Sequence, residues 1–287
     1  MKGQKTALIL GTAQFDPTYG VARTEAADPA TCDFLKEAHR LGYAALDTAP
    51  SYSEAQEVIG RCGWAGGIHS KISAGEDAVL SLANTLRNLG RDSVDVAYFH
   101  DDRIVQKDKT FFEQTVNDIS PVLAKRVGVS VYSAGDFEKA LEIKDIRAIQ
   151  VPMSVIDQRI TDVHLSQARE SDTHVFARSI FLQGALLASS ETLPPFLGQL
   201  RESIERISAL SQKYSRPILD LLIGFVRDRS GVDGLVVGAE SISQLQEIAQ
   251  SFASPPLPDT LIDELRQLKI DEADIIDPRT WVPKRPR

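Results

Sequence analysis

The sequence predicts a (β/α)8 TIM barrel in one domain over residues 1–287, with an extra C-terminal helix and tail. Eight short apolar runs bounded by Gly, Pro, Ser or Asp recur along the chain, and longer stretches with helical spacing follow them. The 287 residues also fit one such barrel, whose usual size is about 250 residues. Eight β-then-α repeats favour a parallel sheet, and its closure leaves no exposed edge strand.

The predicted strands are the eight apolar runs. In chain order they are Ala7–Leu10, Ala44–Leu46, Gly67–Ile68, Val94–Phe99, Arg126–Val129, Ala148–Val151, Thr173–Ala177 and Gly234–Val237. An open doubly wound sheet is the alternative, but it would normally carry G-x-G-x-x-G after its first strand. The segment from Leu10 to Phe15 lacks that motif. The pattern therefore favours the barrel.

The predicted helices have recognisable ends. Asp28 is typical of an N-cap with Pro29 at the first helical position, and Gly42 lies where a helix usually stops. Apolar spacing further predicts helices at Ala78–Leu89, at Pro217–Arg229 and after a capping box formed by Ser241 and Gln244. The segment Ser254–Pro258 is interpreted as the turn into the extra C-terminal helix.

Composition and charge narrow the class of protein. The chain is 43% hydrophobic and 25% charged, which is typical of a globular protein, and its net charge of −8 disfavours nucleic acid as a partner. The N-terminal apolar run is too short for a signal peptide or a membrane span. Cys32 and Cys62 offer neither a disulfide framework nor a zinc ligand set. We therefore expect a cytoplasmic protein without a metal site and with no membrane partner.

Four ionisable residues are expected at one end of the barrel, where the active sites of such barrels lie. Asp47 ends the second strand, Tyr52 lies in the loop after it, Lys71 follows the third strand and His100 ends the fourth. The carboxyl ends of these strands meet at one rim, so we expect the four side chains to converge.

These residue types suit the reduction of a carbonyl group. Hydride transfer leaves negative charge on the carbonyl oxygen, which needs a proton donor. Tyrosine, with a reference pKa of about 10, is a weak proton donor at neutral pH unless a neighbouring cation lowers that pKa. We expect Lys71 to do so for Tyr52, Asp47 to hold the ammonium, and His100 to orient the substrate. Taken singly, each residue has a structural interpretation as a turn, rim or surface residue.

The ordered motifs resemble a known family. The segments Leu46-Asp47-Thr48-Ala49-Pro50-Ser51-Tyr52, Ser70-Lys71-Ile72 and Tyr98-Phe99-His100-Asp101 resemble the Asp/Tyr/Lys/His tetrad of the aldo-keto reductases. Further segments in the family's order are Leu10-Gly11-Thr12, Gly128-Val129-Ser130, Ile149-Gln150, Ala177-Arg178-Ser179 and Val237-Gly238-Ala239-Glu240-Ser241. The resemblance covers nearly the whole chain and implies a barrel that binds NAD(P)H without a Rossmann fold.

The resemblance also implies cofactor-binding residues. Ser130 and Gln150 would hold the nicotinamide carboxamide, and Ser179, Leu182 and Gly184 would approach the pyrophosphate through the backbone. The complete set comprises Thr12, Asp47, Ser130, Gln150, Arg178, Ser179, Leu182, Gly184, Gly238, Ala239, Ser241, Gln244 and Glu247. The last five belong to the segment expected at the adenosine end.

Several positions depart from the family pattern. Val131 replaces a frequent Asn, and Arg178 stands where a ring-stacking Tyr is common, so a guanidinium plane could stack instead. Basic residues that usually grip the 2′-phosphate are absent, since Gly238, Glu240 and Gln244 stand there. The family implies NADPH as cofactor, and these substitutions leave NADH as an alternative.

Four residues are candidates for the substrate pocket: Phe15, Tyr19, Asp101 and Trp281. Asp101 could equally lie in a solvated loop. Packing of the C-terminal tail is an equal alternative for Trp281. Gln150 could instead satisfy a backbone group inside the barrel, and Gln244 already has a capping role.

The leading hypothesis is an NAD(P)H-dependent carbonyl reductase acting on an aldehyde or ketone, possibly one derived from a sugar, with Tyr52 as the general acid. In one alternative, Lys71 forms a Schiff base as in an aldolase. In another, the chain is a cofactor-binding regulatory subunit without significant turnover. The sequence determines neither the carbonyl substrate nor the oligomeric state.

Overall fold

The fold is described from a computed structural model over residues 6–16, 30–52, 54–73, 75, 77–100, 105, 109–189, 191, 193 and 195–281. Its strands are β1 (Ala7–Gly11), β2 (Ala45–Asp47), β3 (Gly67–Ile72), β4 (Val94–Phe99), β5 (Ala124–Ser130), β6 (Ala148–Pro152), β7 (His174–Arg178) and β8 (Gly234–Gly238). Each strand pairs in parallel with the next, and β8 pairs with β1 to close the barrel. The predicted fold class is confirmed.

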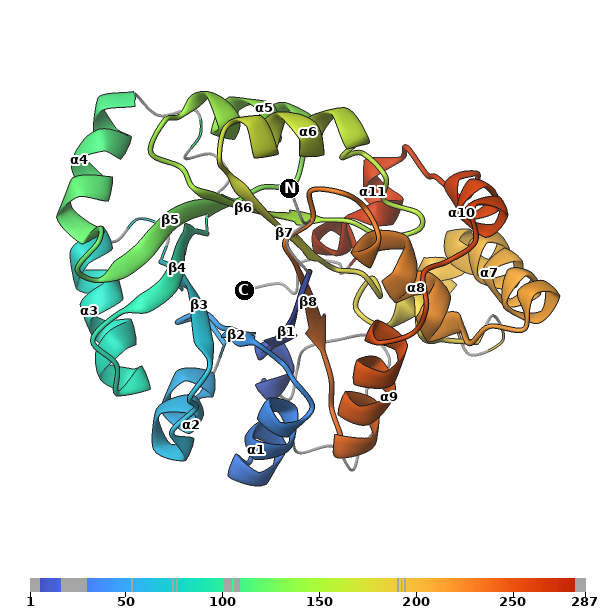
Figure 1. Ribbon diagram of the computed structural model, residues 1–287, viewed down its shortest axis with the longest axis horizontal. Helices are drawn as coiled ribbons and strands as arrows, with labels where there is room; N and C mark the ends of the chain where they lie inside the picture. The colour runs from blue at the N-terminus through green and yellow to red at the C-terminus, as the bar shows by residue number, and fades with distance from the viewer. Residues whose placement is uncertain are drawn as a thin grey trace.

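The helices surround this barrel (Figure 1). They are α1 (Cys32–Arg40), α2 (Ala55–Cys62), α3 (Ala78–Leu89), α4 (Lys109–Ile119), α5 (Ala134–Glu142), α6 (Asp162–Glu170), α7 (Arg201–Tyr214), α8 (Ile218–Arg227), α9 (Ile242–Phe252), α10 (Asp259–Arg266) and α11 (Ala273–Ile276). Short 3-10 helices are η1 (Ala13–Phe15), η3 (Ala185–Leu187), η4 (Pro195–Leu200) and η5 (Pro278–Thr280). The predicted C-terminal helix corresponds to α10. Helix α8 contacts β8, and α7 and α10 lie farther out, beyond α8 (Figure 1).

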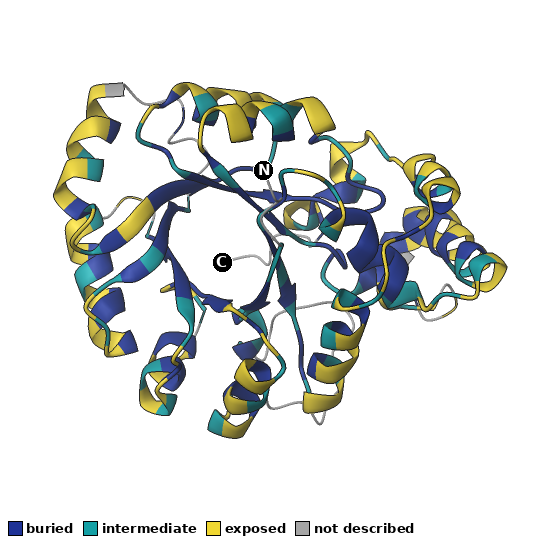
Figure 2. Ribbon diagram, in the orientation of Figure 1, coloured by how far each residue is buried: buried dark blue, intermediate teal, exposed yellow. Residues whose placement is uncertain are grey.

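The core has two parts. Side chains between the strands and the helices form the larger one, and the helices turn their exposed faces outward (Figure 2). A smaller cluster that includes Ile9, Val96, Tyr98 and Phe176 draws its residues from five of the strands. His69 lies against the Phe176 ring at a centroid distance of 4.7 Å. The barrel interior is therefore packed.

The start of α1 differs from the expectation. The helix begins at Cys32, and Thr31 is its N-cap, because the Thr31 side chain accepts a hydrogen bond from the backbone N–H of Phe34 at 3.2 Å. The predicted cap, Asp28, and the following Pro29 lie outside the described residues.

A disulfide joins Cys32 at the start of α1 to Cys62 at the end of α2, with the two Cα atoms 5.0 Å apart. The expectation that these cysteines form no disulfide was wrong. The two residues are 30 positions apart in sequence, and the packing of α1 against α2 makes them neighbours.

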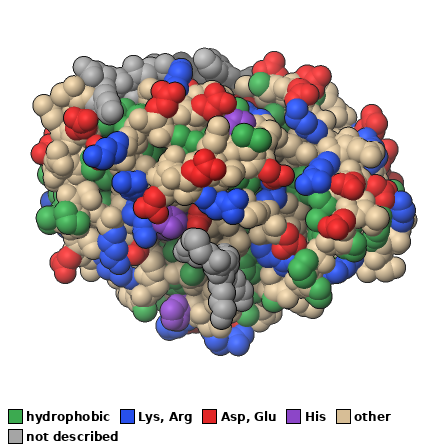
Figure 3. Space-filling view, turned by 45° about the horizontal axis from the view of Figure 1, so that its top comes forward, with side chains coloured by type: hydrophobic (Ala, Val, Ile, Leu, Met, Phe, Trp, Pro, Cys, Tyr) green, Lys and Arg blue, Asp and Glu red, His purple; other side chains and the backbone are tan. Residues whose placement is uncertain are grey.

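The surface carries both signs of charge. Lys and Arg side chains are interspersed with Asp and Glu over the face shown in Figure 3. Among the helices of the described segments, none is long and apolar enough to cross a membrane.

Candidate active site

A buried ion pair lies at the carboxyl ends of β2 and β3. The Lys71 Nζ donates to Asp47 Oδ1 at 2.6 Å and to the Thr48 carbonyl oxygen at 3.1 Å. The Asp47 side chain is 5% exposed and that of Lys71 is 2% exposed, so water screens the pair little. Hence the expected contact between these two side chains exists.

Asp47 has further partners that fix its position. Gln150 on β6 donates from Nε2 to Asp47 Oδ2 at 2.7 Å. Thr12 donates from its hydroxyl to the Asp47 carbonyl oxygen at 3.1 Å. Thr12 is fully buried and does not line the cavity described below, so it acts on the backbone that carries Asp47. Lys71 and Gln150 thus each bind one oxygen of the carboxylate, and Thr12 binds the backbone of the same residue.

Tyr52 lies beside this pair. The Lys71 Nζ is 5.3 Å from the centroid of the Tyr52 ring. We expected the ammonium to lower the pKa of Tyr52, and this was wrong. Burial raises that pKa well above its ordinary value, the Asp47 carboxylate raises it further, and the Arg178 guanidinium opposes both effects. The phenol therefore stays protonated at neutral pH.

These groups line a cavity of about 610 Å³, a size common for ligand sites. Of the predicted residues, Asp47, Tyr52, Lys71, His100, Ser130, Gln150, Arg178, Ser179, Gly184, Gly238, Gln244 and Glu247 line it. The structure therefore brings all four members of the predicted tetrad to one cavity. Their chemical roles remain predictions.

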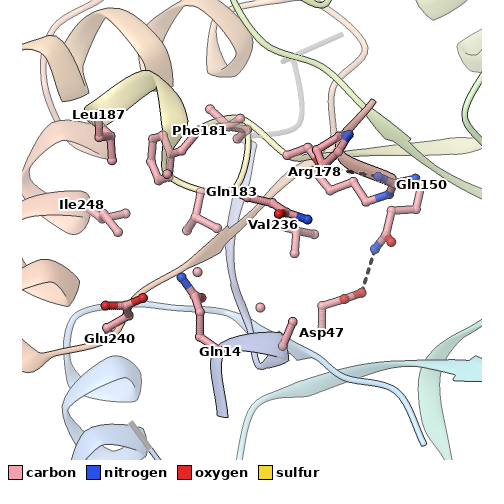
Figure 4. A pocket seen from close by; sticks show the side chains of 18 of the residues that line it. Gln14, Asp47, Gln150, Arg178, Phe181, Gln183, Leu187, Val236, Glu240 and Ile248 are labelled. Carbon is pink, nitrogen blue, oxygen red and sulfur yellow. Dashed lines mark hydrogen bonds between the residues drawn. The ribbon is translucent and has the colours of Figure 1, made fainter. Parts of the chain in front are cut away.

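The cavity has two chemically different ends (Figure 4). Asp47, Gln150 and Arg178 lie at one end. Gln14 and Glu240 lie at the other, near the apolar side chains of Phe181, Leu187 and Ile248. A Cβ atom on Gly238 would lie only 1.6 Å from the Gln14 Oε1, so glycine there lets Gln14 lie flat against β8.

Besides Thr12, three further expected cofactor residues do not line the cavity. Leu182 is fully buried, and its N–H donates to the Ser179 carbonyl oxygen at 2.9 Å. Ala239 is buried in the core. The Ser241 hydroxyl caps α9 by accepting from the Gln244 N–H at 3.3 Å.

Two cavity-lining residues also make local hydrogen bonds. The Gly184 N–H donates to the Phe181 carbonyl oxygen at 3.0 Å, which leaves it no free donor for a pyrophosphate. The Gln244 Oε1 accepts from the Glu240 N–H at 2.8 Å. The predicted capping box would direct this bond to the N-cap residue Ser241, so only its other half, the bond from the Gln244 N–H to the Ser241 hydroxyl, is present.

The expected substrate-pocket residues fall into two groups. Phe15 packs edge-on against Phe34 at a centroid distance of 6.1 Å, and the Trp281 indole N–H donates to the Ile275 carbonyl oxygen at 3.0 Å. Both side chains are buried in the core and neither lines the cavity, so tail packing describes Trp281. Tyr19 and Asp101 lie outside the described residues.

Sequence reasoning missed several lining residues. Gln14 follows β1 and Tyr132 follows β5, so the rule that chemistry lies at strand ends could have found both. Gln183 and Arg279 lie in segments without such a signal. Both Arg178 and Arg279 lie over the Tyr132 ring, with guanidinium carbons 4.1 and 3.2 Å from its centroid.

The residues present fit a nicotinamide cofactor. The Gln150 Oε1 is buried and has no hydrogen-bond partner, while its Nε2 is bound to Asp47. An unpaired buried acceptor is costly, and the carboxamide N–H of a nicotinamide would satisfy it. Among the described residues, no group of three or more His, Cys, Asp or Glu side chains could hold a metal ion.

A closed barrel with a buried Asp–Lys pair beside a tyrosine, at the end of a long cavity, defines a class of acid–base enzyme site. The sequence matches the Aldo/keto reductase family over residues 7–270. The chain therefore belongs to this family.

Similar proteins agree with this assignment. A D-threo-aldose 1-dehydrogenase of a Pseudomonas species is 25% identical over 205 residues, which cover 66% of this chain and 61% of that enzyme's length. Aldo-keto reductase AKR11C1 of Bacillus halodurans superposes with a TM-score of 0.70 at 18% identity, over 98% of both chains. For a Bombyx mori aldo-keto reductase in complex with NADP, the TM-score is 0.68 at 19% identity, over 94% of this chain and 92% of that one.

Proposed function

We propose that the protein is an NAD(P)H-dependent carbonyl reductase that transfers hydride to an aldehyde or ketone. The observation that carries the proposal is the buried Asp47–Lys71 ion pair beside Tyr52 on the wall of the cavity. This arrangement places a protonated phenol next to a fixed cation, as protonation of a developing alkoxide requires.

The bound cofactor supplies the hydride. Ser130 and the unpaired Gln150 Oε1 would hold the carboxamide of its nicotinamide, which determines the ring face that meets the substrate. The other end of the dinucleotide would lie toward Gly238, Gln244 and Glu247, where the apolar side chains near Glu240 provide an adenine surface.

Tyr52 is the general acid in this proposal. Burial raises its pKa, so the phenol keeps its proton until negative charge develops on the carbonyl oxygen. The Lys71 ammonium then stabilises the phenolate that forms, and Asp47 keeps the ammonium in place. His100, which lines the same cavity, orients the carbonyl oxygen.

The contacts of Lys71 favour this role over a Schiff base. A Schiff base needs a neutral amine as nucleophile. The Lys71 Nζ instead donates to the Asp47 carboxylate and to the Thr48 carbonyl oxygen, and a paired carboxylate stabilises the charged ammonium.

A hydroxylated, sugar-derived carbonyl is the substrate class we propose. Besides the side chains assigned to the cofactor, the cavity carries polar groups from His100 and Tyr132, which suit hydroxyl groups. Two relatives whose names indicate polyhydroxy substrates support this class: the D-threo-aldose 1-dehydrogenase and a glycerol dehydrogenase of Gluconobacter oxydans.

The test begins with titration of NADH and NADPH by calorimetry, followed by a panel of aldehydes and sugar ketones with the better-bound dinucleotide. We expect saturable binding and loss of reduced-nicotinamide absorbance with at least one carbonyl. Binding without any reduction would point to the regulatory alternative. Absence of binding, with borohydride trapping of a substrate on Lys71, would point to the Schiff-base alternative.

A cytoplasmic location is part of the proposal and requires Cys32 and Cys62 to be thiols in the cell, because cytosolic reductants keep thiols reduced. Alkylation in intact cells tests this. Labelling of both cysteines supports the cytoplasm, and protection of both by the disulfide contradicts it.

A further inference from the structure

Arg178 is a cavity-lining cation without an acidic partner. Its guanidinium donates from Nη2 to the Val131 carbonyl oxygen at 3.2 Å and from Nη1 to the Ser179 hydroxyl at 3.3 Å. It also stacks over the Tyr132 ring at 4.1 Å. These three contacts fix the position of the charge without neutralising it.

Two other cationic side chains that line the cavity, Lys71 and Arg279, each have an acidic partner. Lys71 pairs with Asp47 at 2.6 Å, and Arg279 pairs with Asp277 at 2.6 Å. The charge of Arg178 has a lowering effect on the pKa of Asp157, but the hydrogen bonds of that carboxylate, of 2.7 and 2.8 Å, come from Arg159. Within the described part of the chain, Arg178 forms no ion pair.

Arg178 lies at the chemically active end of the cavity. Figure 4 shows it beside Gln150, whose Oε1 is the unpaired acceptor. Its charge also reaches Tyr52, since it opposes the rise in the pKa of that phenol. A hydride donor that serves a carbonyl at Tyr52 must place its nicotinamide ring in this region.

The charge of that ring changes during the reaction. The oxidised nicotinamide ring carries one positive charge, and the reduced ring carries none. A fixed cation close to the ring repels only the oxidised form, and the cavity wall screens this repulsion less than bulk water does.

We propose that Arg178 makes this cavity bind reduced nicotinamide dinucleotide more tightly than the oxidised form. The inference rests on the proposed function. It predicts that the oxidised cofactor leaves readily after reduction, so that it inhibits the enzyme weakly as a product.

The experiment compares dissociation constants rather than rates. Calorimetric titration with the reduced and the oxidised form of the better-bound dinucleotide gives the ratio of the two constants for each protein. The wild type is compared with R178M, which removes the charge, and with R178K, which keeps it. R279M is the matched control, because Arg279 lies over the same Tyr132 ring and is neutralised by Asp277.

We expect R178M to reduce the preference for the reduced form by about tenfold or more, mainly through tighter binding of the oxidised form. We expect R178K and R279M to keep the wild-type ratio. An unchanged ratio in R178M would overturn the inference. If that ratio is unchanged and R178M has a higher KM for carbonyls that carry a carboxylate or phosphate, Arg178 is a substrate anchor instead.

The result also separates this inference from the proposed function. If the wild type binds neither redox form, the proposed function fails. If it binds both, and R178M and wild type share one ratio, only the role of Arg178 fails.

Discussion

At the residue scale, the site depends on one carboxylate with several tasks. Asp47 neutralises Lys71, accepts from Gln150 and raises the pKa of Tyr52. Loss of either partner of such a buried pair leaves an uncompensated charge, at a cost of about 3–5 kcal/mol. Asp47 is therefore both a structural and a chemical residue.

The convergence of the site residues could be predicted because the strand ends of a closed barrel meet at one rim. That rule placed Asp47, Lys71 and His100 correctly on one cavity. It could not give the direction of the pKa shift of Tyr52, because burial depends on packing by elements distant in sequence. Nor could it show that Gln150 uses its amide N–H on Asp47.

Glu240 carries the first prediction. It is a buried residue that lines the cavity at the expected adenosine end, where the exposed Glu247 is also acidic. A carboxylate there would repel a 2′-phosphate and suit a ribose hydroxyl. We expect Glu240→Lys to shift the ratio of dissociation constants toward NADPH by about tenfold.

Calorimetric titration with NADPH and NADH measures this ratio. The control is Gln250→Lys, which adds a positive charge to an exposed position of α9 outside the cavity. An equal shift in both variants would show that Glu240 does not face the 2′-position.

At the scale of elements, glycines mark where two of the helices around the barrel end. Gly63 ends α2 with a φ of +65°, and Gly90 ends α3 with a φ of +62°. Glycine adopts these left-handed conformations without steric cost, which makes such ends visible in sequence. The Cys32–Cys62 link was not visible, since it depends on how α1 lies against α2.

The disulfide leads to a prediction on stability. It closes a loop between residues 30 positions apart, which restricts the unfolded chain. In oxidising buffer we expect Cys62→Ser to lower the free energy of unfolding by about 2–4 kcal/mol. Guanidinium unfolding curves with and without a thiol reductant provide the measurement.

The reductant serves as the control in this experiment. It should lower the stability of the wild type and leave that of Cys62→Ser nearly unchanged. Equal free energies of unfolding for the two proteins in oxidising buffer would mean that the disulfide does not stabilise the protein.

At the scale of the whole molecule, the barrel interior holds a titratable group. The His69 side chain is buried, and this burial is the main reason why its pKa falls to about 4. The unfolded chain binds a proton near pH 6.5, so between about 6.5 and 4 it holds more protons than the folded chain. Stability from neutral His69 is therefore complete above this window and is lost as the pH falls through it.

We expect the free energy of unfolding to fall by up to about 3 kcal/mol from this residue between pH 6.5 and 4. His69→Phe keeps an aromatic ring against Phe176 and removes the titration, so its unfolding free energy should depend less on pH in this window. Denaturant unfolding at a series of pH values makes the comparison. Parallel curves for both proteins would exclude His69 as the source.

The whole-molecule pattern of alternating strands and helices was predictable because each element has its own periodicity. The positions of Phe15 and Trp281 were not, because both are apolar side chains near the expected rim that the core and the C-terminal tail bury. Sequence proximity to a strand end does not show which way such a side chain points.

The most direct test of the account is Tyr52→Phe. The variant keeps the ring next to Lys71 and removes the proton that the proposed mechanism transfers. We expect it to bind the cofactor with the dissociation constant of the wild type and to reduce the best carbonyl at least about 10²-fold more slowly. Reduction at the wild-type rate would contradict the proposed role of this phenol and, with it, the account of the site.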